Sequence, residues 1–286
     1  DIEAYVVRGL KMEDIVKIAI NEYILNYIAL GIDLTKPEKC LIYSQWKNEH
    51  VKNLAFKLSV KVTASTFRAM FDFVFEPSEE DVEKGRGSDT IGKIFYPLID
   101  AADILSPQLP EFGGPKPVLV PVGVDQDVYI RLCHDLAPKF GMVKPSSIYT
   151  KMMCGLQGPG TKMSSSKPET AIFLKDPPEV ADKKLRDAFT GGRPTAKEQK
   201  ELGGQPEICV PYMFLLFHFE DDLLRKVFEE CKSGSLLCGE CKAIISERVC
   251  KFLREHQEKL EKARDILPTV IEEQPFLYKE QELKGI

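Results

Sequence analysis

The sequence predicts an α/β part that extends to about residue 175 and an all-helical part after it. The apolar run at 118–122 is followed by Gly123 and by a helical pattern from about Asp127. Continuous apolar strands that lead into helices are typical of a parallel sheet covered on both faces. From about residue 208 onward, apolar residues recur at helical spacing. A chain of 286 residues is long enough for two such domains.

Helices and strands alternate in the first part of the chain. Residues 12–31 form an amphipathic pattern that ends at Gly31, a common helix C-cap. Residues 40–43 are short and apolar, which predicts a buried strand. Residues 50–71 predict helix, whereas 75–89 are acidic, polar and glycine-containing and predict a surface loop.

Three local signals complete the predicted elements. Because Pro121 lacks the N–H that a central strand needs, we expect the first strand of the sheet to bend or end near it. Residues 147–150 predict a second strand. A helix is expected to follow Asp176, with Asp176 as its N-cap, a proline at its first position and Glu179 completing a capping box.

Charge and cysteine content limit the classes of function. The formal net charge of -5 argues against a surface coated in positive charge for nucleic acid, although 39 Lys and Arg leave room for a local basic groove. No apolar run approaches the roughly 20 residues that a membrane helix needs. Eight cysteines in a chain of this length do not suit a small disulfide scaffold, so they predict a reduced, cytoplasmic compartment.

Four cysteines near the C-terminal end invite comparison with zinc sites: Cys231, Cys238, Cys241 and Cys250. They include one CxxC, a spacing that zinc sites use. Cys241 and Cys250 fall within a helical pattern, however, and neither a second CxxC nor a nearby pair of histidines accompanies them. We therefore predict no structural zinc and assign no metal ligands.

The segment GTKMSSSKPET, residues 160–170, combines a lysine with serines, glycine and proline. Chemistry at a phosphate requires a mobile cation, hydroxyl donors and small residues that let the backbone approach. Lys162, Ser164 and Ser165 supply the cation and the hydroxyls. The spacing is not that of a Walker loop. On these residues alone, a solvated polar loop is at least as well supported as a catalytic one.

Several stretches together resemble one family. Residues 155–166 are similar to the KMSKS signature of class I aminoacyl-tRNA synthetases, and Val124-Asp125-Gln126-Asp127 resembles a strand-end motif of their tryptophanyl and tyrosyl branch. Residues 101–105, AADIL, resemble a pocket motif of that branch. The runs at 190–204 and 217–222 resemble tryptophanyl-tRNA synthetases of the archaeal and eukaryotic type. The similarity follows essentially the whole chain in order.

The resemblance implies a doubly wound, Rossmann-like nucleotide-binding sheet followed by a helical anticodon-binding domain. Residues 1–175 would then be the C-terminal part of the catalytic domain, with a homodimer-interface insertion at about 60–110, and 176–286 the anticodon-binding domain. The family's HIGH motif, which belongs near the first strand of the sheet, does not occur in these 286 residues. We therefore expect an incomplete sheet and a C-terminal portion of a longer enzyme, or else a shortened relative that binds without catalysis.

The implied reaction is adenylation of tryptophan by ATP with Mg²⁺, followed by transfer to tRNA(Trp). Lys162 is the implied catalytic residue, with Ser164 and Ser165, because its charge stabilises pyrophosphate as it leaves. Gly123 and Met163 join Lys162 and Ser164 in the implied ATP site. The implied partners are tRNA(Trp), tryptophan, ATP and a second copy of the chain, in the cytoplasm and without a membrane.

Four residues are implied as contacts of the amino acid. Gln126 would bind its ammonium or carboxylate, and Asp103 would accept from the indole N–H. The alternative for Gln126 is a loop side chain that faces water. The alternative for Asp103 is a carboxylate that forms a salt bridge within its helix. Glu3 matches a position that contacts the substrate in the family, and the alternative is a solvated glutamate near the end of the chain. Asp100 stands where the family often has glutamine.

Two other functions remain open from the sequence. A carboxylate accepts from a phenol as well as from an indole, so Asp103 does not separate tryptophan from tyrosine. A tyrosyl-tRNA synthetase is therefore one alternative, although the run at 190–204 argues against it. A non-catalytic fragment that binds tRNA or a partner protein is the other.

Overall fold

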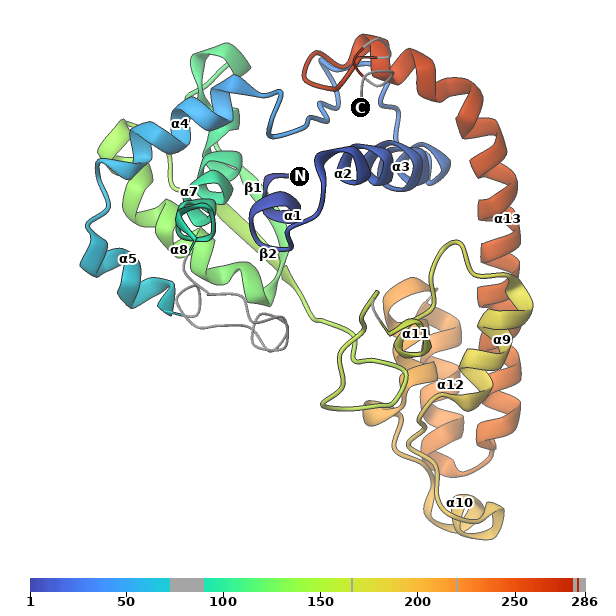
Figure 1. Cartoon of the computed structure of the whole chain (residues 1–286). Helices are drawn as coiled ribbons and strands as arrows, with labels where there is room; N and C mark the ends of the chain where they lie inside the picture. The colour runs from blue at the N-terminus through green and yellow to red at the C-terminus, as the bar shows by residue number, and fades with distance from the viewer. Residues whose placement is uncertain (73–89, 166, 220, 280–281, 283–286) are drawn as a thin grey trace. The chain divides into compact units, whose positions relative to one another are not determined.

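The computed structural model describes residues 1–72, 90–165, 167–219, 221–279 and 282, so the loop predicted at 75–89 lies outside the described residues (Figure 1). The chain forms two compact units. The first unit consists of Asp1–Lys151 with Ala263–Ile286, and the second of Met152–Lys262. These limits differ from the predicted boundary at residue 175, because the second unit begins earlier and the C-terminal segment returns to the first. Within the described ranges, no helix is long and apolar enough to cross a membrane.

The first unit consists mainly of helices. They are α1 (Ile2–Val6), α2 (Met12–Ile18), the π-helix η1 (Ala19–Ile24), α3 (Leu25–Ala29), α4 (Glu49–Ser59), α5 (Ala64–Met70), α7 (Ile91–Leu105) and α8 (Asp127–Leu136), with short 3₁₀ turns at Ser106–Gln108, Pro110–Phe112, Val124–Gln126 and Ala137–Phe140. The helix predicted for 12–31 is confirmed, with a π-helical middle, and Gly31 adopts a φ of +96° after it. The helix predicted for 50–71 is confirmed as two helices, α4 and α5.

A two-stranded parallel sheet follows, formed by β1 (Leu119–Gly123) and β2 (Ser146–Thr150). Both strands and the helix after β1 are therefore confirmed. The strand does not end at Pro121, which pairs with Ile148, because each strand of a two-stranded sheet is an edge strand and edge strands tolerate proline. The expected cover on both faces is wrong for these residues: Leu119 is 58% and Ile148 54% exposed. The opposite face of the sheet, which carries Val120 and Val122, is partly buried.

The predicted strand at 40–43 is wrong, since these residues belong to no strand. The side chain of Gln274 takes the place of a neighbouring strand. Its Nε2 donates to the carbonyl oxygens of Leu34, at 2.7 Å, and Cys40, at 2.9 Å, while its Oε1 accepts from the Ile42 N–H at 3.0 Å. One fully buried amide from the C-terminal segment thus satisfies the backbone groups that a sheet would otherwise have paired.

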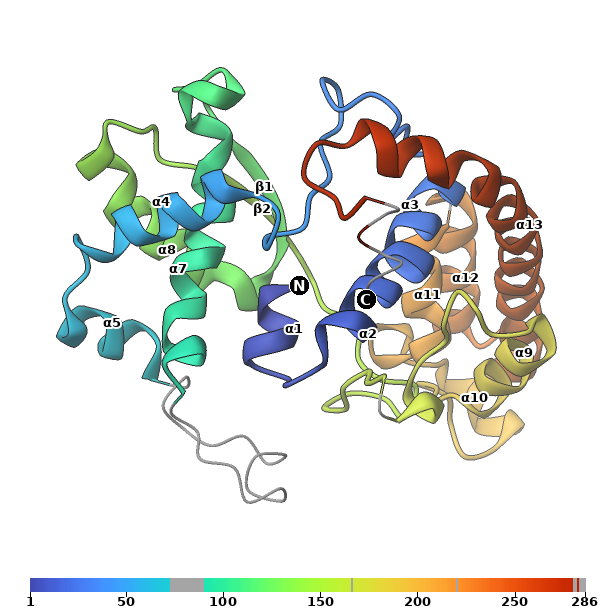
Figure 2. The ribbon, with the colours of Figure 1, turned by 45° about the horizontal axis from the view of Figure 1, so that its top comes forward.

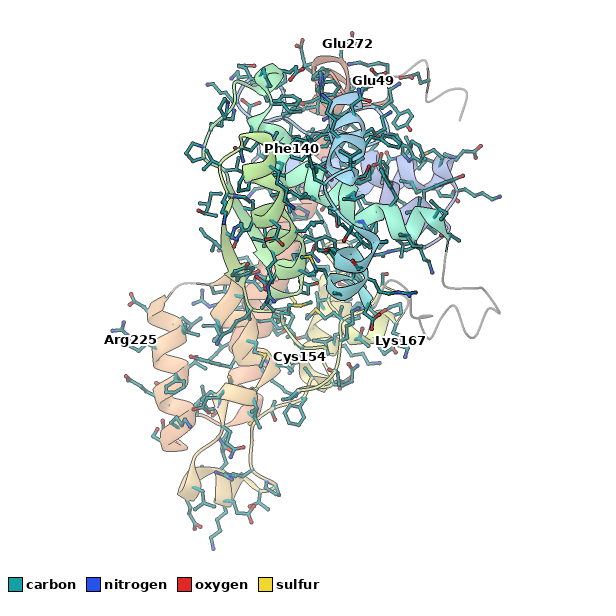
Figure 3. All side chains as sticks on the ribbon, turned by 90° about the vertical axis from the view of Figure 1, so that its left-hand side faces the viewer. Glu49, Phe140, Cys154, Lys167, Arg225 and Glu272 are labelled. Carbon is teal, nitrogen blue, oxygen red and sulfur yellow. The ribbon has the colours of Figure 1, made fainter. Side chains whose placement is uncertain are left out.

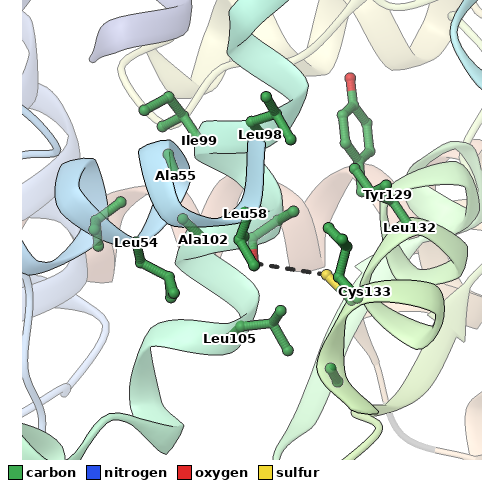
Figure 4. Close-up of a cluster of buried hydrophobic side chains, with 14 of the residues drawn as sticks. Leu54, Ala55, Leu58, Leu98, Ile99, Ala102, Leu105, Tyr129, Leu132 and Cys133 are labelled. Atoms are coloured by element: carbon green, nitrogen blue, oxygen red, sulfur yellow. Dashed lines mark hydrogen bonds between the residues drawn. The ribbon is translucent and has the colours of Figure 1, made fainter. Parts of the chain in front are cut away.

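The core of the first unit forms where α7 packs against α4 and α8 (Figure 4). Leucines and alanines of the three helices interdigitate there, and Ala101 and Ala102 of α7 are fully buried. The Sγ of Cys133 on α8 lies 3.6 Å from the Ala101 carbonyl oxygen, the contact drawn as a dashed line. Because small residues let helices approach closely, this packing fixes the rotation of α7 and hence the direction of its polar residues.

The second unit contains α9 (Pro178–Asp187), α10 (Ala196–Leu202), α11 (Val210–His218), α12 (Asp221–Ser233) and the N-terminal part of α13 (Cys238–Glu273), with 3₁₀ turns at Pro168–Thr170 and Pro206–Ile208 (Figure 2). The all-helical prediction after about residue 208 is confirmed. Leu185, Val210, Leu215 and Ile245 are completely buried in the core of this unit. Arg225 of α12 projects away from that core into solvent (Figure 3).

The capping box predicted at Asp176 is wrong. Helix α9 begins at Pro178, and its N-cap, Pro177, offers no side-chain hydrogen bond. Asp176 instead accepts from the Phe173 N–H at 2.9 Å and from Lys184 Nζ at 2.7 Å. A lysine inside α9 therefore captures the carboxylate that was expected to cap the helix.

We predict that Gln274→Met destabilises the first unit by about 2 kcal/mol at nearly constant side-chain volume, because it leaves the buried Leu34 carbonyl and the partly buried Cys40 carbonyl and Ile42 N–H without their partner. Thermal unfolding and hydrogen exchange at Ile42 are the measurements. The exposed Gln205→Met in the second unit is the matched control, and we expect it to change stability by less than about 0.5 kcal/mol. Equal effects of the two substitutions would contradict the role given to Gln274.

Candidate active site

Two carboxylates of α7, Asp100 and Asp103, face away from its apolar side. They lie three residues apart and therefore project from the same side of the helix. Residues Leu98, Ile99, Ala101, Ala102 and Leu105 of the same helix are buried in the core. The packing of the apolar side of α7 therefore orients Asp100 and Asp103 together, and both carboxyl groups are half-buried.

Asp103 is held by two side chains from the segment that Gln274 anchors. Its Oδ1 accepts from the Tyr43 hydroxyl at 2.7 Å, and its Oδ2 accepts from the Gln45 amide. Burial raises the pKa of Asp103, and these two hydrogen bonds act in the opposite direction. The alternative of a helix salt bridge is not what the structure shows, since both partners are neutral donors. Each carboxylate oxygen retains a second lone pair for a further donor.

The surroundings of Asp100 disfavour the charged form of its carboxyl group. Burial raises the pKa of Asp100 to about 7, a hydrogen bond from Tyr96 opposes the rise, and the charges of Asp103 and Glu3 add to it. Burial and the same carboxylate raise the pKa of Tyr96 well above its usual range. A carboxyl group that changes charge near neutral pH is the kind of group that functional sites contain.

Glu3 and Asp125 extend this acidic region. Glu3 of α1 accepts from Arg8 at 3.2 Å, so it is an ion-paired residue and not a freely solvated one. Burial raises the pKa of Tyr129 to about 12, and the charges of Asp100, Glu3 and Asp125 contribute. Tyr129 thus lies within electrostatic reach of carboxylates from three segments.

The carboxyl end of β1 supplies Gly123 and Gln126. Gly123 ends the strand in an extended conformation, and the Asp125 carboxylate lies close to its Cα. Gln126 precedes α8, is half-buried, and donates from Nε2 to Asp125 Oδ2 at 3.2 Å. In open α/β sheets, ligands bind outside the carboxyl ends of parallel strands, where these residues lie.

The loop that carries Lys162 belongs to the second unit. Gly158 has a φ of +104°, and a Cβ there would lie 2.6 Å from the Phe189 ring. Lys162 and Ser165 are exposed, and Met163 and Ser164 are half-buried. Among the described residues, Lys162 has neither a hydrogen-bond nor an ion-pair partner. The loop therefore presents an uncommitted cation to solvent.

Thr170 fastens this loop, and sequence reasoning did not single it out. Its hydroxyl accepts from the Ser164 N–H at 2.9 Å and donates to the Lys167 carbonyl at 2.7 Å. Its own carbonyl accepts from the Leu156 N–H at 2.9 Å. Thr170 is only 8% exposed. A threonine after a serine-rich run gives no clear sequence signal, because its partners are backbone groups.

The structure thus brings some of the predicted residues together. Asp100, Asp103 and Glu3 form one acidic region in the first unit. Gln126 reaches that region only through its neighbour Asp125. The loop residues Lys162, Met163, Ser164 and Ser165 form a separate group in the second unit. Tyr43, Gln45, Tyr96 and Tyr129 are additional polar residues that the sequence motifs did not include.

We predict that Asp100→Asn flattens the dependence of stability on pH. Folded Asp100 keeps its proton up to about pH 7, whereas in the unfolded chain an aspartate loses it above about pH 4. This stabilising contribution is complete below the unfolded pKa and is lost as the pH rises toward 7. Between about pH 5 and pH 8, the wild type should therefore lose more thermal stability than the variant.

Asp135→Asn, an exposed position on α8, is the control for that measurement and should follow the wild-type pH profile. Superimposable profiles for Asp100→Asn and the wild type would contradict the assignment of a raised pKa to Asp100.

We also predict that Thr170→Val loosens the Lys162 loop. The substitution keeps the shape but leaves the Ser164 N–H without its acceptor, a loss of about 1–2 kcal/mol of local stability. Amide exchange across residues 161–167 should accelerate roughly five- to thirtyfold. Thr170→Ser retains the hydroxyl and should restore most of the protection. Unchanged exchange in the valine variant would show that other contacts hold the loop.

Most of the chain is similar to known proteins of one family. Residues 1–254 match the family model described as tRNA synthetases class I (W and Y). The tryptophan–tRNA ligase of Methanocaldococcus jannaschii is 45% identical over 279 residues, covering 95% of this chain and 71% of the relative. That of Methanopyrus kandleri is 41% identical over 280 residues, covering 96% and 70%.

A solved structure supports the same relationship. The crystal structure of tryptophanyl-tRNA synthetase from Aeropyrum pernix matches with a TM-score of 0.82 at 42% sequence identity, covering 94% of this chain and 70% of that one. The small parallel sheet and the many helices are thus parts of a class I synthetase fold. By sequence and by fold, the chain belongs to the class I tRNA synthetases of the tryptophan and tyrosine group, and within it to the tryptophan–tRNA ligases.

Proposed function

We propose that the protein activates tryptophan with ATP and transfers the resulting aminoacyl group to tRNA(Trp). Identities of 41–45% to tryptophan–tRNA ligases favour tryptophan over tyrosine as the amino acid. Mg²⁺ would enter with ATP, since this ion is usually bound largely through phosphate oxygens and water. A tRNA-charging reaction also favours the cytoplasm as its location.

Lys162 is the residue to which we assign catalysis. The observation that carries the assignment is an exposed ammonium without a partner among the described residues, on a loop that Thr170 fastens. A cation in this state can approach phosphate groups as negative charge develops on the leaving pyrophosphate. Ser164 and Ser165 add hydroxyl donors, and Met163 and Gly123 complete the proposed ATP contacts.

The acidic region of the first unit is the proposed tryptophan site. Asp103 retains acceptor capacity for the indole N–H after binding Tyr43 and Gln45. Asp100 and Glu3 would attract the ammonium group, because the region is rich in carboxylate charge. Gln126 would hydrogen-bond the ammonium or the carboxylate of the amino acid through its neutral amide. Tyr43 and Gln45 would fix the orientation of Asp103, which prepares the site before the substrate arrives.

Two roles of larger segments complete the proposal. We assign residues 1–175 to the catalytic part, with a homodimer interface at about 60–110, and 176–286 to anticodon binding. The interface assignment is supported by exposed apolar side chains, because Val60 is 76% and Ile91 77% exposed. Large exposed apolar groups of this kind are common at protein interfaces.

Amino-acid-dependent exchange between ATP and pyrophosphate tests the function. The protein should catalyse exchange with tryptophan and not with tyrosine. Exchange with tyrosine alone would overturn the proposal. Binding of tRNA(Trp) without any exchange would instead support the non-catalytic alternative.

The same assay tests the catalytic assignment. We predict that Lys162→Ala slows exchange by about 100-fold or more, as removal of one preorganised charge or donor does in other enzymes, while the dissociation constant for tryptophan changes little. Lys167→Ala, on the same loop and also exposed, is the matched control and should remain close to wild type (Figure 3). Equal losses of exchange and tryptophan binding would indicate a structural role for Lys162.

A further inference from the structure

Residues 274–279, which follow α13, lie against residues 42–47 of the same unit (Figure 1). The Gln274 side chain accepts from the Ile42 N–H at 3.0 Å, and the Phe276 carbonyl oxygen accepts from the Ser44 N–H at 3.0 Å. We call residues 274–279 the C-terminal strap. The strap therefore holds the backbone on both sides of Tyr43.

We propose that the C-terminal strap positions the candidate amino-acid site, so that docking of the strap and binding of tryptophan strengthen each other. The inference rests on the proposed function and adds a group of residues that contact neither tryptophan nor ATP in the proposed sites. Gln274 is accordingly a positioning residue, which acts on Asp103 through Tyr43 and Gln45.

The path from the strap to the carboxylates is short. Tyr43 donates to one oxygen of Asp103 at 2.7 Å, and the Gln45 amide donates to the other. The Oε1 of Gln45 also accepts from the Ile2 N–H at 3.0 Å, which connects the same segment to the start of α1. Ile2 precedes Glu3 in that helix. Two carboxylates of the acidic region, Asp103 and Glu3, thus depend on where residues 42–45 lie.

Side chains fasten the strap at both of its ends. At its start, Lys279 Nζ closes the C-terminus of α13 by donating to three carbonyl oxygens at 2.6–3.0 Å. At its end, Lys47 Nζ lies 5.2 Å from the centroid of the Tyr278 ring and forms an ion pair with Glu282. Leu277 between them is buried. The docked strap is therefore a defined part of the first unit.

A cavity of about 340 Å³ lies beside the strap. Leu277 and Tyr278 line it from the strap, Tyr43 and Ser44 from the opposite segment, and apolar side chains of α2, η1 and α3 complete its wall. Side chains beside a cavity have fewer contacts than those in a close-packed core. On this side, hydrogen bonds to the strap hold residues 42–44 more than packing does. Regions with few buried contacts open at low free energy, so the strap has a docked and a released state.

The two states differ in how they present Asp103 to a substrate. In the docked state, Tyr43 and Gln45 fix the carboxylate before tryptophan arrives, whereas release of the strap frees both donors. The apparent dissociation constant for tryptophan therefore rises as the docked fraction falls. Because the coupling is reciprocal, bound tryptophan must stabilise the docked strap by the same factor.

Equilibrium binding of tryptophan and, separately, of ATP tests the proposal. Gln274→Met should raise the dissociation constant for tryptophan about tenfold. Lys47→Gln, which leaves Gln274 in place, should raise it about twofold. The dissociation constant for ATP, whose proposed contacts lie mainly in the Lys162 loop, should stay within about twofold of wild type in both variants. Glu273→Gln, at an exposed position beside the strap, is the control and should match wild type for both ligands.

Hydrogen exchange supplies the reciprocal measurement. Saturating tryptophan should slow hydrogen exchange at the Ser44 N–H of the wild type by about tenfold or more. Exchange at the Leu236 N–H, which donates to the Glu230 carbonyl in the second unit, should stay unchanged.

ATP–pyrophosphate exchange by the wild type with tryptophan reports the proposed function separately. Where that reaction occurs, unchanged tryptophan affinity in Gln274→Met and Lys47→Gln would overturn the role of the strap alone. Equal losses of tryptophan and ATP affinity in Lys47→Gln would do the same, since they would indicate general damage to the fold. A wild type that does not bind tryptophan would overturn both proposals.

Discussion

The rotation of α7 about its own axis is the constraint on which the candidate amino-acid site depends. Fully buried Ala101 and Ala102 let α4 and α8 approach α7 closely, and only one rotation places both alanines in the core. That rotation directs Asp100 and Asp103 away from the core together. A larger side chain at Ala101 would turn or displace the helix, and both carboxylates would move with it. Packing therefore determines where the acidic charge lies.

Loops in both units are held by single buried polar groups in place of regular secondary structure. Gln274 replaces a neighbouring strand beside residues 40–42, and Thr170 closes the turn after Lys162. Each group pairs backbone atoms that would otherwise be buried without partners. The two side chains differ in what they position for function. Gln274 holds the segment that presents Tyr43 and Gln45 to Asp103, whereas Thr170 holds a loop whose lysine stays exposed.

The sequence predicted the elements that depend on local patterns. The apolar run before Gly123 predicted β1 and the helix after it, and the glycine at position 31 predicted the end of a helix. The prediction was wrong where a residue distant in the sequence determines the local structure. The strand predicted at 40–43 is absent because Gln274, more than 230 residues away, supplies the hydrogen bonds. Lys184 similarly draws Asp176 out of its expected capping role.

The residues of the candidate site also fall into two groups, those that the sequence predicted and those that it did not. The family resemblance led to Lys162, Asp100 and Asp103, because these positions lie within or beside contiguous motifs. Tyr43 and Thr170 contribute through contacts that only folding creates. The resemblance also supplied the roles of the predicted residues, which the geometry by itself does not assign.

The cysteines show that local spacing does not identify which of them lie close together. A CxxC at 238–241 is a local signal, and the nearest further cysteines on either side are Cys231 and Cys250. On α13, Cys250 is about three turns beyond Cys238 and packs beside Pro178. Cys209 is far away in sequence, yet α11, α12 and α13 fold so that it lines the same cavity as the CxxC. Side chains from three segments therefore line one cavity, and the contact between them arises only when the chain folds.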